Sequence, residues 1–205
     1  MTHVCVLSQE RVLLDKATDL GGRLIRAFEA PSGLPYTTIN LATGGHTVPS
    51  WLGGNLLLAE VGTSQMEFVS LSKHSGDPKF RQKALHVFDV LDREGGPVDA
   101  DGGRMWPIHI RPESGKSHGS TYSWGAMGDS YYEYLLKVWL LTGKQHESYK
   151  RMYLESVRSM IKKLVVEDDG LTCGMPKLPC CPLSPVPHAP YPMPPVPQCP
   201  ITHNP

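Results

Sequence analysis

One stretch of almost wholly apolar residues constrains the fold of this 205-residue chain more than any other feature. It begins at Gly128-Asp129 and continues to Leu141, and its interior consists mainly of tyrosine, leucine, valine and tryptophan. A helix that is apolar on nearly every side is buried inside a larger core. The stretch therefore predicts a helix that lies on the inside of the fold.

The start of the same helix carries two carboxylates. Asp129 is predicted to be the N-cap, because a carboxylate there accepts hydrogen bonds from free backbone N–H groups. Asp129 and Glu133 are four residues apart and share one face of the helix. At the mouth of a buried helix such groups need a partner, water, a metal or a reaction. Two interpretations follow: Asp129 only caps and Glu133 only bonds a tyrosine, or both belong to a reactive site.

Composition excludes several classes of function. The chain has 20 basic and 20 acidic residues, which argues against nucleic acid or an anionic membrane as the main partner. It has no run of eighteen apolar residues, and residues 1–7 are too short and too polar for a signal peptide. We therefore expect no membrane contact and no targeting segment from this sequence.

The C-terminal residues differ in character from the rest. Twelve of the nineteen prolines lie between Pro176 and Pro205, and such density disfavours helix and sheet. We predict a globular body over residues 1–172 and a disordered Pro/Cys-rich tail over residues 173–205. The tail holds four of the five cysteines, which could pair in an oxidising compartment, although we favour unpaired thiols. The body holds only Cys5, which gives no disulfide framework and no metal spacing.

The body contains a weak internal repeat. Ser8, Ser75 and Thr142 recur at intervals of 67 residues, each before a new helical pattern. At the same offset Leu13, Lys16 and Ala17 match Phe80, Lys83 and Ala84. A recurring helix-turn-helix unit predicts an array of αα-hairpins. The alternative is coincidence among common loop residues.

Hydrophobic periodicity predicts the remaining elements. Helices are expected at about Glu10–Phe28, Asn55–Lys73, Pro78–Arg93 and Ser148–Val166, with a short strand and turn at residues 105–115. The charges of the third helix, from Arg81 to Arg93 and including Asp92, predict a solvated face. Residues 31–49 are expected to be loop, because glycine and proline interrupt them.

Two further acids lie on the predicted helix Asn55–Lys73. Glu60 and Glu67 are seven residues apart, so they face the same way among apolar neighbours and are not expected to face solvent. They are either site residues or a buried pair bonded to arginine or backbone. Asp99 and Asp101 lie in a glycine-rich segment that lacks the twelfth-position acid of an EF-hand loop, so we predict no calcium site at these two residues.

Four motifs together resemble the class I α1,2-mannosidases, glycoside hydrolase family 47. The first, GDSYYEYLLKVW, starts at Gly128 and is similar to the family's GDS-[FY]-YEYLLK-x-W motif. The others are the segments GLPYTTIN from Gly33, AEVGTSQMEF from Ala59 and LSKHSGDPKF from Leu71. The resemblance extends over about residues 7–172.

The resemblance implies a fold, an activity and a set of site residues. The family fold is an (α/α)7 barrel, in line with the αα-hairpin repeat, so this chain is expected to have an all-α fold that forms a partial αα-hairpin toroid with a short β-hairpin. Family members remove α1,2-linked mannose from high-mannose N-glycans in the Golgi or endoplasmic-reticulum lumen, with inversion and a bound calcium ion. By motif, Asp129 matches a catalytic carboxylate, and Glu60, Glu67 and Glu133 are expected to bind substrate.

Met127 separates subfamilies within this resemblance. Endoplasmic-reticulum enzymes have the motif GARADSYYEY, with arginine two residues before the aspartate, whereas this sequence has methionine there. A thioether cannot make the bidentate hydrogen bonds of a guanidinium. The chain therefore resembles the Golgi or plant type, with Met127 expected to contact substrate.

The resemblance also implies missing parts. The family's first carboxylate precedes the segment that matches Leu7, and its other carboxylate and its calcium-binding threonine follow the segment that matches Thr172. The resemblance therefore implies no metal ligand in this chain. We therefore expect a fragment that is inactive alone and that leaves apolar surface exposed around residues 56–68 and 135–141. The alternative is a non-catalytic module that binds glycans or another partner.

Overall fold

The computed structural model describes residues 11–96, 98–168 and 171–174, with side chains as far as Val165. Ser8 and Cys5 lie outside the described residues. The predicted tail also lies outside the described residues from residue 175 onward, with three of its cysteines. Its predicted start is wrong, because Cys173 and Gly174 belong to a strand over Leu171–Gly174.

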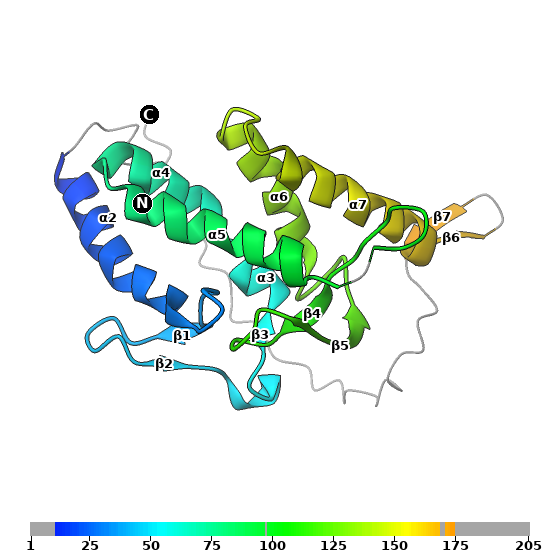
Figure 1. The fold of residues 1–205 in the computed structure, drawn as a ribbon, viewed down its shortest axis with the longest axis horizontal. Coiled ribbons are helices and arrows are strands. Elements are labelled where there is room, and N and C mark those ends of the chain that lie inside the picture. The colour runs from blue at the N-terminus through cyan, green and yellow to red at the C-terminus, as the bar shows by residue number, and fades with distance from the viewer. Residues whose placement is uncertain (1–10, 97, 169–170, 175–205) are drawn as a thin grey trace, which may run out of the picture.

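Helices form most of the described structure, and they are arranged in a row (Figure 1). Helix α2 (Arg11–Leu24) continues into the 3₁₀ helix η1 (Ile25–Glu29) at one end of the row. Helices α4 (Gln65–Ser75) and α5 (Pro78–Glu94) form a hairpin in the middle, and α6 (Asp129–Leu141) and α7 (Glu147–Leu164) form a second hairpin beside it. The helical class and two of the predicted αα-hairpins are thus confirmed.

The predicted repeat corresponds to these hairpins. Ser75 is the last residue of α4, and Thr142 directly follows the last residue of α6. Asp77 caps α5, since its Oδ1 accepts a hydrogen bond from the Lys79 N–H at 3.0 Å, and Pro78 follows in the first turn. The 67-residue interval therefore marks equivalent turns of two consecutive hairpins.

A small antiparallel sheet lies beside the start of α6. Strands β4 (Pro107–Ile110) and β5 (Ser117–Tyr122) form the predicted hairpin, and β3 (Leu56–Leu57) adds to β4 through the pairs Leu56–Ile110 and Leu57–His109. Two short pairings were not predicted. One pairs β1 (Thr38–Ile39) with β2 (His46–Thr47), and the other pairs β6 (Val165–Asp168) with β7 (Leu171–Gly174). The short helix η2 (Ser50–Leu52) follows β2.

The predicted helix Asn55–Lys73 is wrong as a single element. Its first residues form β3, and a single helical turn, α3 (Leu58–Val61), is followed by a break before α4 begins at Gln65. Gly62 sits at the break, where a Cβ would lie 2.5 Å from Cδ2 of Tyr131 on α6. The chain turns there because α6 packs closely against the glycine.

The other helix boundaries lie near their predicted positions. The first helix continues to Glu29 as a 3₁₀ turn, one residue beyond the prediction. The last helix ends at Leu164, two residues before the predicted Val166, because the chain passes directly into β6.

The core is aromatic and centres on α5. Seven side chains of α5 are buried, and among them Phe88 packs edge-to-face against Tyr131 of α6 and Tyr149 of α7. The expected exposure of residues 56–68 is wrong, because the large apolar residues there are buried or half-buried. Exposure near the end of α6 is confirmed: Leu140 is 53% and Leu141 47% exposed, so α6 is not buried on every side.

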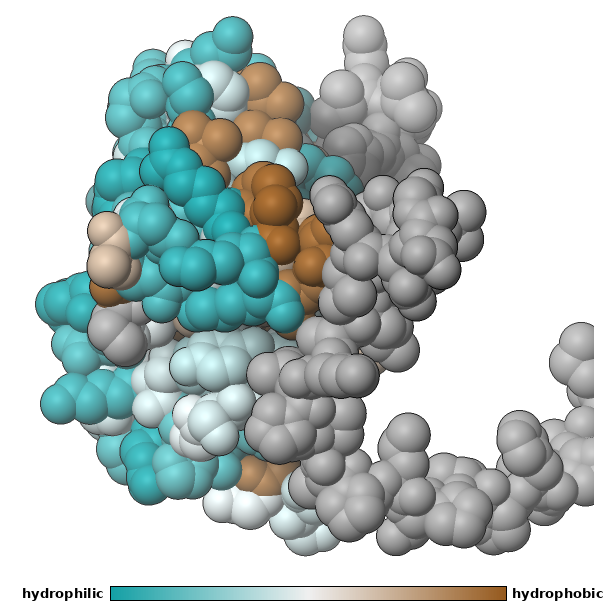
Figure 2. Space-filling model, turned by 90° about the vertical axis from the view of Figure 1, so that its right-hand side faces the viewer, coloured by the Kyte–Doolittle hydropathy of each residue, from teal (hydrophilic) through white to brown (hydrophobic). Residues whose placement is uncertain are grey.

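Other apolar side chains also reach the surface. They include Leu154 and Ile161 of α7. Figure 2, which views the molecule from the right-hand side of Figure 1, shows apolar side chains in brown among hydrophilic ones in teal.

The predicted solvated face of α5 needs one correction. Asp92 is half-buried and forms ion pairs with Arg104 and with Arg151 of α7. The Arg104 side chain is only 5% exposed, and it also pairs with Glu155 of α7. This cluster joins the two helical hairpins.

None of the helices in the described residues is long and apolar enough to cross a membrane.

Candidate functional site

A tight turn places Asp129 at the start of α6. The N–H groups of Gly128 and Asp129 both donate to the Gly125 carbonyl, at 3.1 and 2.8 Å. A Cβ at Gly128 would lie 2.4 Å from the Ser123 carbonyl oxygen, so only glycine fits at this position. Gly128, not Asp129, is the N-cap, which corrects the sequence prediction.

The Asp129 carboxylate is exposed and makes few interactions with the described residues. Within the described part of the chain, its Oδ1 accepts one hydrogen bond, from the Ser130 N–H at 2.8 Å. A carboxylate in this state keeps further acceptor positions for a hydroxyl group or water. The capping interpretation therefore does not account for this side chain.

Helix α3 is fixed against the same turn. The Ala59 N–H donates to the Met127 carbonyl at 3.0 Å, which joins the residue before Glu60 to the residue two before Asp129. Met127 has a left-handed backbone (φ 72°), and its side chain is 43% exposed. Such a backbone is unfavourable for methionine and is often found at functional sites. The structure thus brings Glu60, Met127 and Asp129 onto adjoining segments.

Glu60 and Glu67 are both exposed, so the prediction that they avoid solvent is wrong. The break at Gly62 places Glu60 on α3 and Glu67 in the first turn of α4. Neither carboxylate is a member of a buried pair with arginine, and that alternative is also wrong for this part of the chain.

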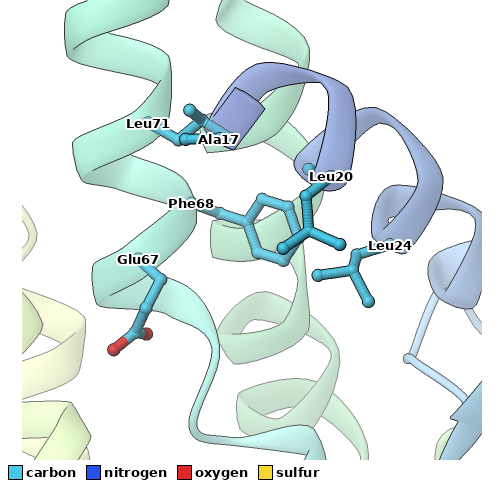
Figure 3. Close-up of a pocket in the computed structure, with 7 residues that line it drawn as sticks. Ala17, Leu20, Leu24, Glu67, Phe68 and Leu71 are labelled. Atoms are coloured by element: carbon cyan, nitrogen blue, oxygen red, sulfur yellow. The ribbon is translucent and has the colours of Figure 1, made fainter. Parts of the chain in front are cut away.

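Glu67 is bonded across the two hairpins. Its Oε1 accepts the Tyr134 hydroxyl at 3.0 Å, and these two residues are 67 positions apart, at equivalent places in α4 and α6. Glu67 also borders an apolar pocket between α2 and α4, but in Figure 3 its carboxylate points away from Leu20, Leu24 and Phe68. Glu67 is therefore held by α6 rather than aimed into that pocket.

This contact predicts a pH dependence. Burial, together with the Glu67 carboxylate, raises the pKa of Tyr134 to about 12. The fold favours the protonated phenol, so its contribution to the free energy of unfolding is complete below pH 10 and is lost as the pH rises from 10 to 12. We expect Glu67→Gln to lower the Tyr134 pKa, because the variant removes the negative charge beside the phenol.

The measurement is a tyrosine titration by absorbance, with Tyr134→Phe identifying the signal. Glu60→Gln is the matched control, because that carboxylate has no contact with Tyr134 and should leave the titration unchanged. An identical Tyr134 pKa in Glu67→Gln and the parent chain would contradict the described contact.

Glu133 lies one turn after Asp129, on the same side of α6. It pairs with Lys137 at 2.7 Å, and not with a tyrosine as one interpretation predicted. Asp129, Glu133 and Lys137 line a surface hollow of about 410 Å³, together with Trp124, Tyr132, Leu136 and Tyr153 of α7. The shared face of the two carboxylates is thus confirmed, and it borders a concave surface.

Sequence reasoning missed several residues of this hollow. Trp124 precedes the helix in an unassigned loop, and Tyr153 comes from the next helix, so neither shows its position by spacing alone. A signal existed for Lys137, which follows Glu133 by four residues in the usual arrangement of a helical ion pair. Glu67 and Tyr134 could have been paired from the repeat interval.

The described residues do not fit a calcium site. No group of three or more carboxylate, histidine or cysteine side chains comes together in this part of the chain in a way that could hold a metal ion. Asp99 and Asp101 are bonded to Lys163 and Lys162. These lysines lower the pKa of both carboxyl groups, chiefly by hydrogen bonding. No chemical step is therefore assigned to calcium here.

Comparisons with known proteins agree on one family. The model of glycosyl hydrolase family 47 matches residues 2–175. A mannosyl-oligosaccharide 1,2-alpha-mannosidase of Arabidopsis thaliana is 42% identical over 163 residues, which are 77% of this chain and 28% of that protein. The endoplasmic reticulum mannosyl-oligosaccharide 1,2-alpha-mannosidase of Homo sapiens is 37% identical over 155 residues, 75% of this chain and 22% of that protein.

A solved structure agrees with these relatives. The alpha-1,2-mannosidase from Trichoderma reesei superposes with a TM-score of 0.68 at 28% identity, over 79% of this chain and 33% of that one. The chain spans about a quarter of the length of the curated relatives it matches.

Proposed function

Because this chain belongs to glycosyl hydrolase family 47, we propose that it contributes part of the active site of an inverting α1,2-mannosidase. The observation that carries the proposal is the exposed Asp129 carboxylate, which accepts a single hydrogen bond among the described residues, beside a hollow at the start of α6. The names of the relatives support α1,2-linked mannose as the substrate linkage.

The proposed roles follow from position. Asp129 acts as a catalytic carboxylate, because it keeps free acceptor positions at a concave surface. Glu60 and Met127 contact substrate from the adjoining α3 and turn. Glu133 borders the same hollow, and Glu67 positions α4 through Tyr134.

Inverting hydrolysis needs a second carboxylate on the opposite side of the sugar, about 6.5–9.5 Å away, with a water molecule between them. We assign this second carboxylate to no residue of the described structure. We also assign no calcium ligand among the described residues.

The finer proposals concern architecture and location. The two hairpins α4–α5 and α6–α7 are consecutive units of an (α/α)7 toroid, in keeping with their 67-residue interval and the likeness to the Trichoderma reesei enzyme. The substrate is a high-mannose N-glycan, and the place of action is the secretory pathway, with a Golgi or plant type favoured by Met127.

The test is a chimera. In it, this chain's matching segment replaces the corresponding 163-residue stretch of the Arabidopsis thaliana relative. We expect the chimera to release mannose from α1,2-mannobiose, because the exchanged segment would provide Asp129 and its surroundings. The 205-residue chain alone is expected to release none, since inverting hydrolysis needs two carboxylates and only Asp129 is assigned such a role here. A folded chimera without release would contradict the proposal.

A further inference from the structure

The hollow beside α6 has an aromatic wall that the proposed function does not use. The Trp124 ring lies parallel to the Tyr132 ring, with centroids 4.1 Å apart and an interplanar angle of 7°. Tyr132 is 1% exposed, and its hydroxyl donates to the Trp106 carbonyl at 3.4 Å. A buried and bonded ring therefore supports Trp124 from behind, while Trp124 itself is half-buried and lines the hollow.

Negatively charged, positively charged and neutral polar residues line the same hollow. Asp129 and Glu133 offer carboxylate oxygens, and Lys137 holds Glu133 at 2.7 Å. Tyr153 adds a phenol from α7. The hollow thus combines a supported aromatic face with hydrogen-bond acceptors and donors.

We propose that this hollow is a sugar subsite in which Trp124 stacks against one hexopyranose ring. A pyranose has an apolar face of C–H groups, which suits an aromatic ring, and a rim of hydroxyl groups, which suit carboxylate, ammonium and phenol partners. The volume of about 410 Å³ falls within the usual range of ligand sites, about 300–1,000 Å³. That the ring is mannose rests on the proposed function.

The aromatic residues of this subsite are distinct from the carboxylates that the proposed function uses. Trp124 and Tyr153 lie outside the four sequence motifs, and the two side chains come from different elements, the loop before α6 and α7 itself. Trp124 would bind and orient the sugar and take no part in bond cleavage.

The experiment measures binding of α1,2-mannobiose to the 205-residue chain by calorimetry. We expect Trp124→Ala to raise the Kd about tenfold, and Trp124→Phe to raise it less than threefold, because phenylalanine keeps a ring against Tyr132. Tyr153→Phe should raise the Kd about three- to tenfold through the loss of one hydrogen bond. Trp51→Ala is the control, because Trp51 is 64% exposed on η2 and lies outside the hollow.

Two results would overturn the subsite: no binding by the parent chain, or equal Kd values for the parent, Trp124→Ala and Tyr153→Phe. Circular dichroism of each variant excludes loss of fold, and Tyr153→Phe keeps the test valid if Trp124→Ala unfolds. Maltose is titrated in parallel. If maltose binds as tightly as α1,2-mannobiose and its binding depends on Trp124, the sugar subsite is supported and the mannosidase proposal is not. The two proposals can therefore fail separately.

Discussion

Asp129→Asn in the Arabidopsis chimera is expected to lower kcat/KM for α1,2-mannobiose by about 10²–10⁴-fold. A positioned acid or base typically contributes a factor of this size, and an amide can neither donate nor accept the proton in its place. The substitution keeps the size of the side chain and a carbonyl oxygen for the Ser130 N–H. The loss should therefore fall on the reaction and not on the fold.

Asp15→Asn is the matched control for this variant. Asp15 is an exposed carboxylate on α2, away from the hollow, so its loss should leave kcat/KM unchanged. A similar fall in both variants would show that the assay reports general damage rather than the role of Asp129.

Arg104→Ala is expected to destabilise the chain by about 3–5 kcal/mol, the usual effect of removing one partner from a buried ion pair. Arg104 Nε donates to Glu155 at 3.1 Å, and the other guanidinium nitrogens donate to the Asp92 carbonyl at 2.8 Å and to its carboxylate at 2.6 Å. The guanidinium also lies over the Trp106 ring. Alanine would leave two carboxylates close together with only the half-exposed Arg151 beside them.

Urea unfolding of the 205-residue chain measures this loss. Arg23→Ala is the control, because Arg23 forms an exposed pair with Asp19 on α2 and such pairs contribute about 0.3–0.5 kcal/mol. Losses for the two variants that agree within about 1 kcal/mol would contradict the structural role of the cluster.

Local signals in the sequence predicted much of this fold. Asp77 and Pro78 marked the start of α5, and the 67-residue interval marked the turns at Ser75 and Thr142. These predictions succeeded because helix starts and tight turns depend on residues close together in the chain. The position of Asp129 at a helix start was confirmed for the same reason.

The break between α3 and α4 depends on distant residues and could not be predicted locally. Leu56 and Leu57 pair with β4, the Ala59 N–H bonds to Met127, and Gly62 packs against Tyr131. Apolar spacing alone gave one continuous helix, because the tertiary contacts that interrupt it leave no local pattern. The same contacts hold the segment that carries Glu60 against the turn that precedes Asp129.

The stacked Trp124 and the ion pairs of Asp92 were missed for a similar reason. A charge on an amphipathic helix indicates a solvated face only until a partner from another element is known. Arg104 comes from the segment after α5, and Arg151 and Glu155 come from α7. Only the assembled fold brings these residues to Asp92.

The start of α6 is proposed to be a reaction site and not only a helix terminus. The most direct test of this proposal measures mannose release and thermal unfolding on the same preparations of the chimera, with and without Asp129→Asn. We predict release by the parent chimera, release by the variant that is slower by about 10²–10⁴-fold, and melting temperatures that agree within about 2 °C, since an exposed surface substitution changes stability little. Release by the variant at the parent rate would contradict the account.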